Sequence, residues 1–403
     1  MQAFNRFTTL WLSCSLTLLA QQGTTTTLEN YLSSTKEKIY ELEYEKNEAS
    51  YSILRDSWIA PIELNYNYIK TNPYEDLQTN QSASVRLHQP IFQSGGIYFG
   101  VKHAEALKRF SDYSVKVAKY KAMGSILSLL MQIEQTSLKI KRQQLLVENA
   151  DINLAQKKEQ YLNGQLDASY LDSAIIDKNL AQQTLYDLES AKERLLSNFA
   201  TMSDKDYKTL PLPEFHRLEK ADFLVHNFLL QQSDAEVDMQ NQNHNVTITK
   251  YLPSVSLIGG YNWTKNENPA MPIGEEERDY YDYGIAVNIP LSINSLRDIE
   301  SAKVDTIKAK LQAKDKTLEV ELLYDQVMQN VRNLDKKVAL SKENISLRKK
   351  LLDDTKRLFN AGYKTSYDVD LLTNSLKIEE LTLAIYKIEL NTTLLPLYEV
   401  YEK

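Results

Sequence analysis

The side chains that most often carry out chemistry are scattered along this sequence of 403 residues. Gly95–Gly96 is not part of a strand–GxxxxGKS/T–helix pattern, so it predicts a turn and no phosphate-binding loop. The acidic pairs Asp353–Asp354 and Glu379–Glu380 are most simply interpreted as solvated helix faces. The five histidines show no spacing typical of a metal site, at positions 88, 103, 216, 226 and 244. The sequence therefore predicts no catalytic residue, no metal site and no cofactor, and we expect that the protein is not an enzyme.

The composition favours long secondary-structure elements and disfavours a nucleic-acid partner. By length alone the chain could form two or three domains. It contains only 11 glycines and 10 prolines, so it has few turns. Its net charge of −7 provides no basic face for phosphates. The 25 tyrosines against 10 phenylalanines are typical of a surface that meets water at one end and an apolar phase at the other.

The N-terminal stretch resembles a secretory signal peptide, which we assign to residues 1–21. Arg6 precedes a moderately apolar run from Phe7 to Ala20, and a polar region follows. The alternative is a frayed N-terminus. The only cysteine, Cys14, lies in this stretch, and the residues before it match a lipidation signal poorly. A mature chain without cysteine would use neither disulfides nor thiolate metal sites.

An internal duplication of about 200 residues is predicted by three landmarks that recur in the same order. The separations are 192 residues from Pro61 to Pro253, 200 from Pro90 to Pro290 and 198 from Gly164 to Gly362. The difference between the first two separations falls in a single polar loop, which is longer in the second copy.

Each copy is expected to contain the same series of elements. We place the first repeat at 22–210 and the second at 211–403. Each begins with a helix, at about 28–58 and 219–249. A β-hairpin follows, at 61–90 and 253–291, and then a pair of very long helices, at 97–201 and 296–395.

Alternation of apolar and polar residues predicts amphipathic strands of a length that suits a tilted membrane crossing. One face of the first strand, at 62–69, carries Ile62, Leu64, Tyr66 and Tyr68. The strands at 83–89, 254–263 and 281–291 alternate in the same way. Aromatic residues gather toward the loop ends, as in an interfacial girdle: Tyr66, Tyr68, Tyr74, Tyr261, Trp263, Tyr280, Tyr281 and Tyr283. The alternative is two soluble hairpins packed on a core.

The long helices carry the seven-residue spacing of a coiled-coil seam. About 65 residues at about 1.5 Å each make a helix near 100 Å long, which a globular domain does not need. One seam line becomes polar after Leu334, at Ser341, Arg348 and Thr355. This polarity favours a helix with a second wet face, as in the wall of a water-filled tube, over a plain soluble rod.

Four amphipathic strands cannot close into a water-filled barrel, and an open sheet edge in lipid would leave backbone groups unsatisfied. Several chains must therefore pool their strands if these cross a membrane. Three chains would supply 12 strands and 12 helical positions. The expected fold is an α+β membrane protein, a homotrimeric 12-stranded β-barrel continued by a long α-helical barrel. Pro90, Gly95, Gly96 and Pro290 lie where strand changes to helix and would absorb the change in direction.

The chain resembles TolC-like outer membrane efflux proteins over essentially its whole mature length. The junctions "HQPIFQSGG" and "VNIPLSINS" and the turns "YLNGQLDASYLDS" and "FNAGYKTSYDVDLL" carry this resemblance. It implies a homotrimeric exit duct of an efflux pump or a type I secretion system. The duct would lie in outer membrane lipid, cross the periplasm and dock to a periplasmic adaptor and an inner-membrane pump. The alternative is a soluble or surface-attached coiled-coil structural protein with hairpin binding tips.

The resemblance also assigns roles at the two helix–helix turns. The adaptor-docking tips would be Gly164, Gln165, Leu166, Gly362 and Tyr363. The periplasmic gate would be formed by Asp368, Lys364 and Asp172. The family pattern carries a second acidic residue three positions after Asp368, where this chain has Leu371, so we expect one ring of carboxylates that selects cations. The alternative role of Asp368 is to stabilise a helix N-terminus.

Overall fold

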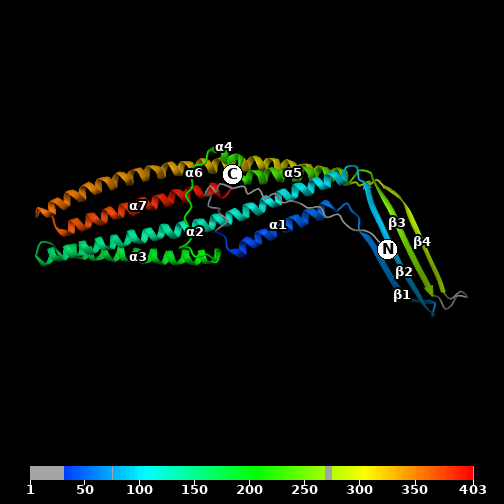
Figure 1. Cartoon of the computed structure of the whole chain (residues 1–403), viewed down its shortest axis with the longest axis horizontal. Coiled ribbons are helices and arrows are strands. Elements are labelled where there is room, and N and C mark those ends of the chain that lie inside the picture. The colour runs from blue at the N-terminus through cyan, green and yellow to red at the C-terminus, as the bar shows by residue number, and fades with distance from the viewer. Residues whose placement is uncertain (1–30, 75, 268–274, 403) are drawn as a thin grey trace, which may run out of the picture.

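The computed structural model describes residues 31–402 except residue 75 and residues 268–274. The predicted signal peptide and Cys14 lie outside the described residues. The molecule is long and narrow, with helices running side by side over most of its length (Figure 1). A sheet continues from one end of the helices at an angle to them, and two helix–helix turns lie at the opposite end.

Nearly the same order of elements occurs twice along the chain, with two helices at the start of the second series where the first has one. The first series is α1 (Ser34–Arg55), β1 (Ile62–Tyr74), β2 (Asp76–Phe92), α2 (Gly96–Leu162) and α3 (Ala168–Met202). The second is α4 (Lys220–Val225), α5 (Phe228–Thr249), β3 (Ser254–Glu267), β4 (Glu275–Asn288), α6 (Ser295–Asn360) and α7 (Ser366–Tyr398). The fold is therefore the expected mixture of long helices and one sheet.

The four strands form a single antiparallel sheet in the order β1-β2-β3-β4. The two hairpins are thus joined side by side through β2 and β3. The two strands of the first hairpin are longer than the predicted 62–69 and 83–89, because Lys70 pairs with Thr79 and Thr71 with Gln78 in the stretch expected to be a loop. Both faces of this stretch are polar, so the period-two signal disappears although the backbone pairing continues.

The helix expected at 219–249 is two helices, α4 and α5. Asn227 lies between them, is fully buried and accepts hydrogen bonds from the backbone N–H groups of Leu229 and Leu230, at 3.0 and 3.2 Å. Asn is one of the preferred N-cap residues, so the Asn227–Phe228 step could have been recognised in the sequence as a helix start.

The hydrophobic core lies near the middle of the long helices, where α4 and the C-terminus fold against them (Figure 1). The middle of α2 contributes residues such as Met123 and Ile133, and α6 contributes Val320–Val331. Phe223 of α4 is fully buried, and its ring lies 5.6 Å from that of Tyr324 and 6.4 Å from that of Tyr401.

Several tyrosines belong to this core rather than to a membrane interface. The Tyr324 hydroxyl donates to the Leu218 carbonyl at 2.7 Å, and the Tyr31 hydroxyl donates to the Pro211 carbonyl at 2.8 Å. These bonds attach the segment between α3 and α4 to α6 and to the residues that precede α1. The core therefore accounts for part of the tyrosine excess, because a buried phenol ring fills apolar space while its hydroxyl bonds to a loop carbonyl.

Two of the three polar seam positions of α6, Ser341 and Thr355, are buried, and Ser341 and Arg348 face Glu379 of α7, which corrects the predicted second wet face at the two buried positions and the predicted solvation of Glu379. Ser341 is buried, and its hydroxyl donates to Glu379 Oε1 at 2.8 Å. The guanidinium of Arg348 lies 3.8 Å from the other oxygen of Glu379, whose side chain is only 14% exposed. Glu379 is therefore an interhelical partner and not part of a solvated face. In the other hairpin, buried Gln143 donates to the Ala181 carbonyl at 2.8 Å.

The helices do not have the hydropathy of membrane spans. Over the part of the chain that the structure describes, no helix is both long and apolar enough to cross a membrane.

Replacing Phe223 with alanine tests whether the mid-helix core holds the molecule together. We expect Phe223→Ala to lower the free energy of unfolding by about 3–5 kcal/mol, because it removes a fully buried aromatic ring. The measurement is the shift of the urea denaturation midpoint followed by circular dichroism.

The matched control is Phe359→Ala, which removes the same side chain from a site where it is 42% exposed. Its effect should be much smaller. Equal midpoints for Phe223→Ala and the unaltered protein would show that this core does not determine stability.

Candidate functional site

The sheet has one apolar and one polar face. Directly opposed residues in an antiparallel sheet project to the same side, so the register assigns each face. The apolar face carries Ile62, Leu64, Tyr66 and Tyr68 of β1, Ala83, Val85 and Leu87 of β2, Val255, Leu257, Tyr261 and Trp263 of β3, and Tyr281, Tyr283, Ile285 and Val287 of β4. The predicted alternation is therefore correct, although Ile289 and Leu291 lie beyond the end of β4.

Most apolar-face side chains are exposed in the single chain, with Tyr283 reaching 85%. The rings of Tyr281 and Tyr283 stack with their centres 6.4 Å apart. Near the loop end, the Trp263 indole donates to Glu277 Oε1 at 2.6 Å and the Tyr261 hydroxyl donates to Asp279 at 3.2 Å. An exposed apolar surface of this size on a soluble monomer is rare and marks a contact with a partner or a membrane.

The opposite face is polar and contains small residues. It carries Glu63, Asn65 and Asn67 of β1, Ser82, Ser84, Arg86 and His88 of β2, Ile258, Gly260 and Asn262 of β3, and Tyr280, Asp282, Gly284 and Ala286 of β4. Tyr280 pairs with Asn262 on this face, so its assignment to the same aromatic girdle as Tyr281 is wrong. Successive residues of a strand point to opposite sides, so only one of the two can lie on the apolar face.

The first strand–helix junction bends at two residues with left-handed backbone conformation. These are Ser94, at φ 49°, and Gly95, at φ 91°, which is the N-cap of α2. Gly96 is already the first helical residue, so the predicted pair of hinge glycines is corrected to Ser94 and Gly95. The Ser94 hydroxyl donates to the Pro253 carbonyl at 2.6 Å and ties this junction to the start of β3.

Pro90 lies inside β2, opposite Ser256, at a shift of register between Pro90 and Phe92. A proline lacks the N–H that a regular ladder requires, which explains why the register shifts here. Pro290 follows the end of β4. It lines a cavity of about 310 Å³ together with Gln93 and Gly96, so the structure brings the two junctions together.

Both helix–helix turns use the same backbone device. At the first tip, Gly164 has φ 70°, its N–H donates to the Tyr161 carbonyl and the Gln165 N–H donates to the Gln160 carbonyl. At the second tip, Gly362 has φ 81°, its N–H donates to the Phe359 carbonyl and the Tyr363 N–H donates to the Leu358 carbonyl. This is the Schellman motif, which requires a residue that tolerates positive φ. The two tips therefore have the same shape and different side chains.

Apolar side chains project into solvent at these tips. Tyr363 is 81% exposed, and Leu162, Tyr170 and Phe359 are also exposed. Leu166 is partly buried, whereas Gln165 is exposed. Such residues at the end of a rigid hairpin can pack against another helix.

Asp368 caps α7 together with Thr365. Its Oδ2 accepts hydrogen bonds from the backbone N–H and the hydroxyl of Thr365, both at 2.9 Å, and its own N–H donates to the Thr365 hydroxyl at 3.3 Å. These bonds, with a smaller contribution from Lys364, whose amine lies 4.0 Å from Oδ1, hold the pKa of Asp368 below its ordinary value of 3.8. In the isolated chain Asp368 thus has the helix-stabilising role.

The equivalent position of the first tip has no such cap. Asp167 is the N-cap of α3 and makes no side-chain capping bond, and Asp172 is exposed. The capping role of Thr365 was missed in the sequence, where Thr-x-x-Asp before an apolar run resembles a capping box.

The described residues contain no group of three or more histidine, cysteine, aspartate or glutamate side chains that could hold a metal ion. The histidines are dispersed accordingly: His88 lies on the polar face of the sheet, and His226 lies beside Asp222 at 3.2 Å.

The capping box of α7 should weaken in acid. The carboxylate form accepts the two bonds, so its stabilisation is complete above the ordinary pKa of 3.8 and is lost as the pH falls through the lowered value in the folded chain. We expect the protection of the Thr365 and Asp368 amides from hydrogen exchange to fall between pH 6 and pH 2, after correction for intrinsic rates.

The first tip provides an internal control, because its N-cap Asp167 accepts no capping bond. In the Asp368→Asn variant, the amides of residues 365 and 368 should show low protection from hydrogen exchange at both pH values. Protection at Thr365 that is independent of pH in the unaltered protein would contradict this account of the cap.

No protein-family model matches the sequence, and no curated protein matches it. Solved structures match it in fold. The outer membrane protein VceC from Vibrio cholerae matches with a TM-score of 0.72 at 12% identity, over 93% of this chain and 96% of that one. CusC, described with its transmembrane channel formation, gives 0.72 at 10% identity over 94% and 92%. The CmeC outer membrane channel of Campylobacter jejuni gives 0.70 at 12% identity over 93% and 85%.

These matches extend over nearly the whole of both chains, so they concern the complete arrangement of sheet and long helices. Identities of this size establish a common fold alone. The chain therefore has the fold of outer membrane channel proteins, which is the fold that the resemblance of its junctions and tips predicts.

Proposed function

We propose that this protein is the outer membrane channel of an export system, a passive duct of the TolC-like efflux type. The observation that carries the proposal is the two-faced sheet, which exposes a continuous apolar surface on one side and a polar surface on the other. Within the chain β1 and β4 are edge strands. In lipid such edges must pair, because their backbone groups find no water.

Pooling the strands of three chains meets this requirement. A homotrimer would close a barrel of 12 strands, with apolar side chains toward outer membrane lipid and polar ones toward a water-filled lumen. The long helices would continue the wall across the periplasm. A soluble coiled-coil structural protein, the alternative function, would gain nothing from an exposed face that includes Leu64, Tyr281 and Ile285.

The repeated helical hairpins support an origin by duplication, with repeats at 22–210 and 211–403. Gln143 and Ser341 are 198 residues apart, as are their respective partners Ala181 and Glu379. This is also the separation of the two tip glycines. One interhelical polar contact is thus retained at the same distance from the tip in both repeats. Residues 1–21 would be the signal peptide that directs the chain to export.

The tips are the proposed contact with a periplasmic adaptor and, through it, an inner-membrane pump of an efflux or type I secretion system. Support comes from the exposed Tyr363 beside Gly362 and the exposed Leu162 beside the first tip. A helical hairpin of the adaptor could pack on these side chains.

The gate is proposed at the same end, with Asp368 as a ring of three carboxylates, Lys364 as its basic neighbour and Asp172 contributed by α3. The cap occupies one oxygen of Asp368, whereas the other faces Lys364. A carboxylate can therefore serve the helix and the ring together. Like charges in such a ring would favour cations and resist closure.

The channel is tested by purifying the protein in detergent, measuring its mass and recording its conductance in planar bilayers. We expect a trimer with discrete conductance steps and a preference for cations. A monodisperse monomer in plain buffer that never conducts would contradict the proposal.

The gate is tested with Asp368→Asn, which should lower the ratio of cation to anion permeability. Thr365→Ala is the matched control, because it removes the capping hydroxyl and leaves the Asp368 carboxylate. A similar loss of selectivity in both variants would assign the effect to the cap, and an unchanged ratio in Asp368→Asn would refute the ring.

A further inference from the structure

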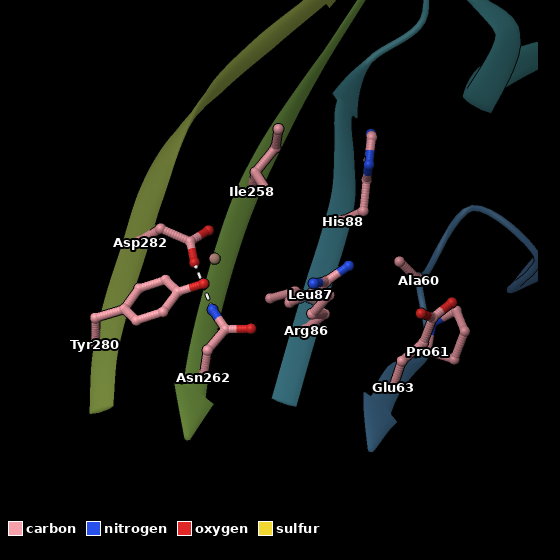
Figure 2. A pocket seen from close by; sticks show the side chains of 11 residues that line it. Ala60, Pro61, Glu63, Arg86, Leu87, His88, Ile258, Asn262, Tyr280 and Asp282 are labelled. Carbon is pink, nitrogen blue, oxygen red and sulfur yellow. Dashed lines mark hydrogen bonds between the residues drawn. The ribbon is translucent and has the colours of Figure 1, made fainter. Parts of the chain in front are cut away.

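Three charged residues and one glycine form a single row across the polar face of the sheet. Glu63 of β1 lies opposite Arg86 of β2, Arg86 opposite Gly260 of β3, and Gly260 opposite Asp282 of β4. The four residues therefore lie at one level of the sheet and project to one side. We call this set the charged row. Figure 2 shows Glu63, Arg86 and Asp282 on three separate strands around one cavity.

Asp282 is held in place by its neighbours on β3. The Asn262 amide donates to Asp282 Oδ1 at 3.0 Å, and Asn262 itself is only 8% exposed (Figure 2). A Cβ atom at Gly260 would lie 2.8 Å from the same oxygen, so the carboxylate occupies the space that the glycine leaves. Asp282 is thus an exposed carboxylate that is oriented by one hydrogen bond and by its position over Gly260.

The three charged side chains of the row form no close ion pair, although Glu63 lies directly opposite Arg86. No ion pair within 4.0 Å joins Glu63, Arg86 or Asp282 to another side chain in the described part of the chain. Arg86 and Asp282 line a cavity of about 470 Å³, which separates the positive from the negative group. The row therefore presents three charges to the space above the polar face, with a sum of −1 per chain.

We propose that the charged row is a second selectivity element of the channel, placed in its barrel. This inference depends on the proposed function, in which the polar face lines the lumen. Three chains would then place nine charges at one level, with a sum of −3. The Debye length is about 10 Å at 0.1 M salt, so these charges act on ions that pass near the wall. A low-dielectric barrel wall strengthens the field further.

This element differs from the proposed gate in place and in composition. Asp368 lies at the helix–helix turns, whereas the charged row lies on the sheet at the opposite end of the molecule (Figure 1). The gate is acidic, and the row contains charges of both signs. Permeant cations would be drawn to Asp282 and Glu63, and anionic groups of an exported solute would be drawn to Arg86.

The test is the reversal potential in a KCl gradient for variants that change one charge per chain. Asp282→Asn should lower the ratio of cation to anion permeability by about twofold, as expected for three charges acting across about 10 Å of screened water. Arg86→Gln should raise the ratio by a similar factor. Effects of opposite sign from two neighbouring residues cannot come from general damage to the barrel.

Asp279→Asn is the matched control. Asp279 belongs to the same strand as Asp282 and loses the same charge, but it lies opposite Trp263 on the apolar face and accepts from Tyr261 there. Its permeability ratio should equal that of the unaltered protein. An equal shift in Asp279→Asn, or no shift in Asp282→Asn and Arg86→Gln, would overturn the charged row while leaving the channel itself intact. If no variant and not even the unaltered protein conducts, the proposed function fails, and the row fails with it.

Discussion

The structure depends on one constraint, that a sheet with an apolar face and open edges cannot remain as it is in either water or lipid. In water the exposed apolar face of the sheet would drive association with other apolar surfaces. In lipid the edge strands β1 and β4 would carry unpaired N–H and C=O groups. Closure with other copies removes both difficulties at once. At the first junction the positive φ of Ser94 and Gly95 turns the chain from β2 into α2, so that the helices continue from the end of the sheet.

The helical part is packed differently, because its hydrophobic core lies at the middle of the long helices. Phe223 and Phe228 pack there against α2, α6 and the C-terminus, and the tyrosine hydroxyls satisfy the carbonyls of the connecting segment. Toward the tips the seam becomes polar, and contacts such as Ser341 with Glu379 replace apolar packing. A buried polar pair of this kind fixes the register of two helices more than it stabilises them.

Much of this architecture could be predicted from the sequence, because periodicity and turn residues are local signals. The alternation at Ile62–Tyr68 and the glycines of both tips identified the strands and the hairpins. The paired stretch around Lys70 could not be found, since its two faces are alike. Glu379 and Tyr280 were misplaced for a related reason: periodicity states that a residue lies on a helix or strand, but only the packing partner and the register decide which side is buried. The capping role of Asp368 follows from its bonds to Thr365 within one chain, whereas the proposed gate role requires several chains and so leaves no pattern in a single sequence.

The central claim is that the apolar face of the sheet contacts lipid and the polar face contacts water. Cysteines introduced one at a time at two successive positions of β4 test this claim most directly. The only native cysteine is Cys14, so single substitutions can be made in a Cys14→Ser background. In lipid vesicles, a cysteine at Ala286 should react with a charged, water-soluble maleimide, whereas one at Ile285 should not. A fluorophore attached at position 285 before reconstitution should be quenched by brominated lipid, and one at position 286 should not. Equal reactivity and equal quenching at the two positions would contradict the account.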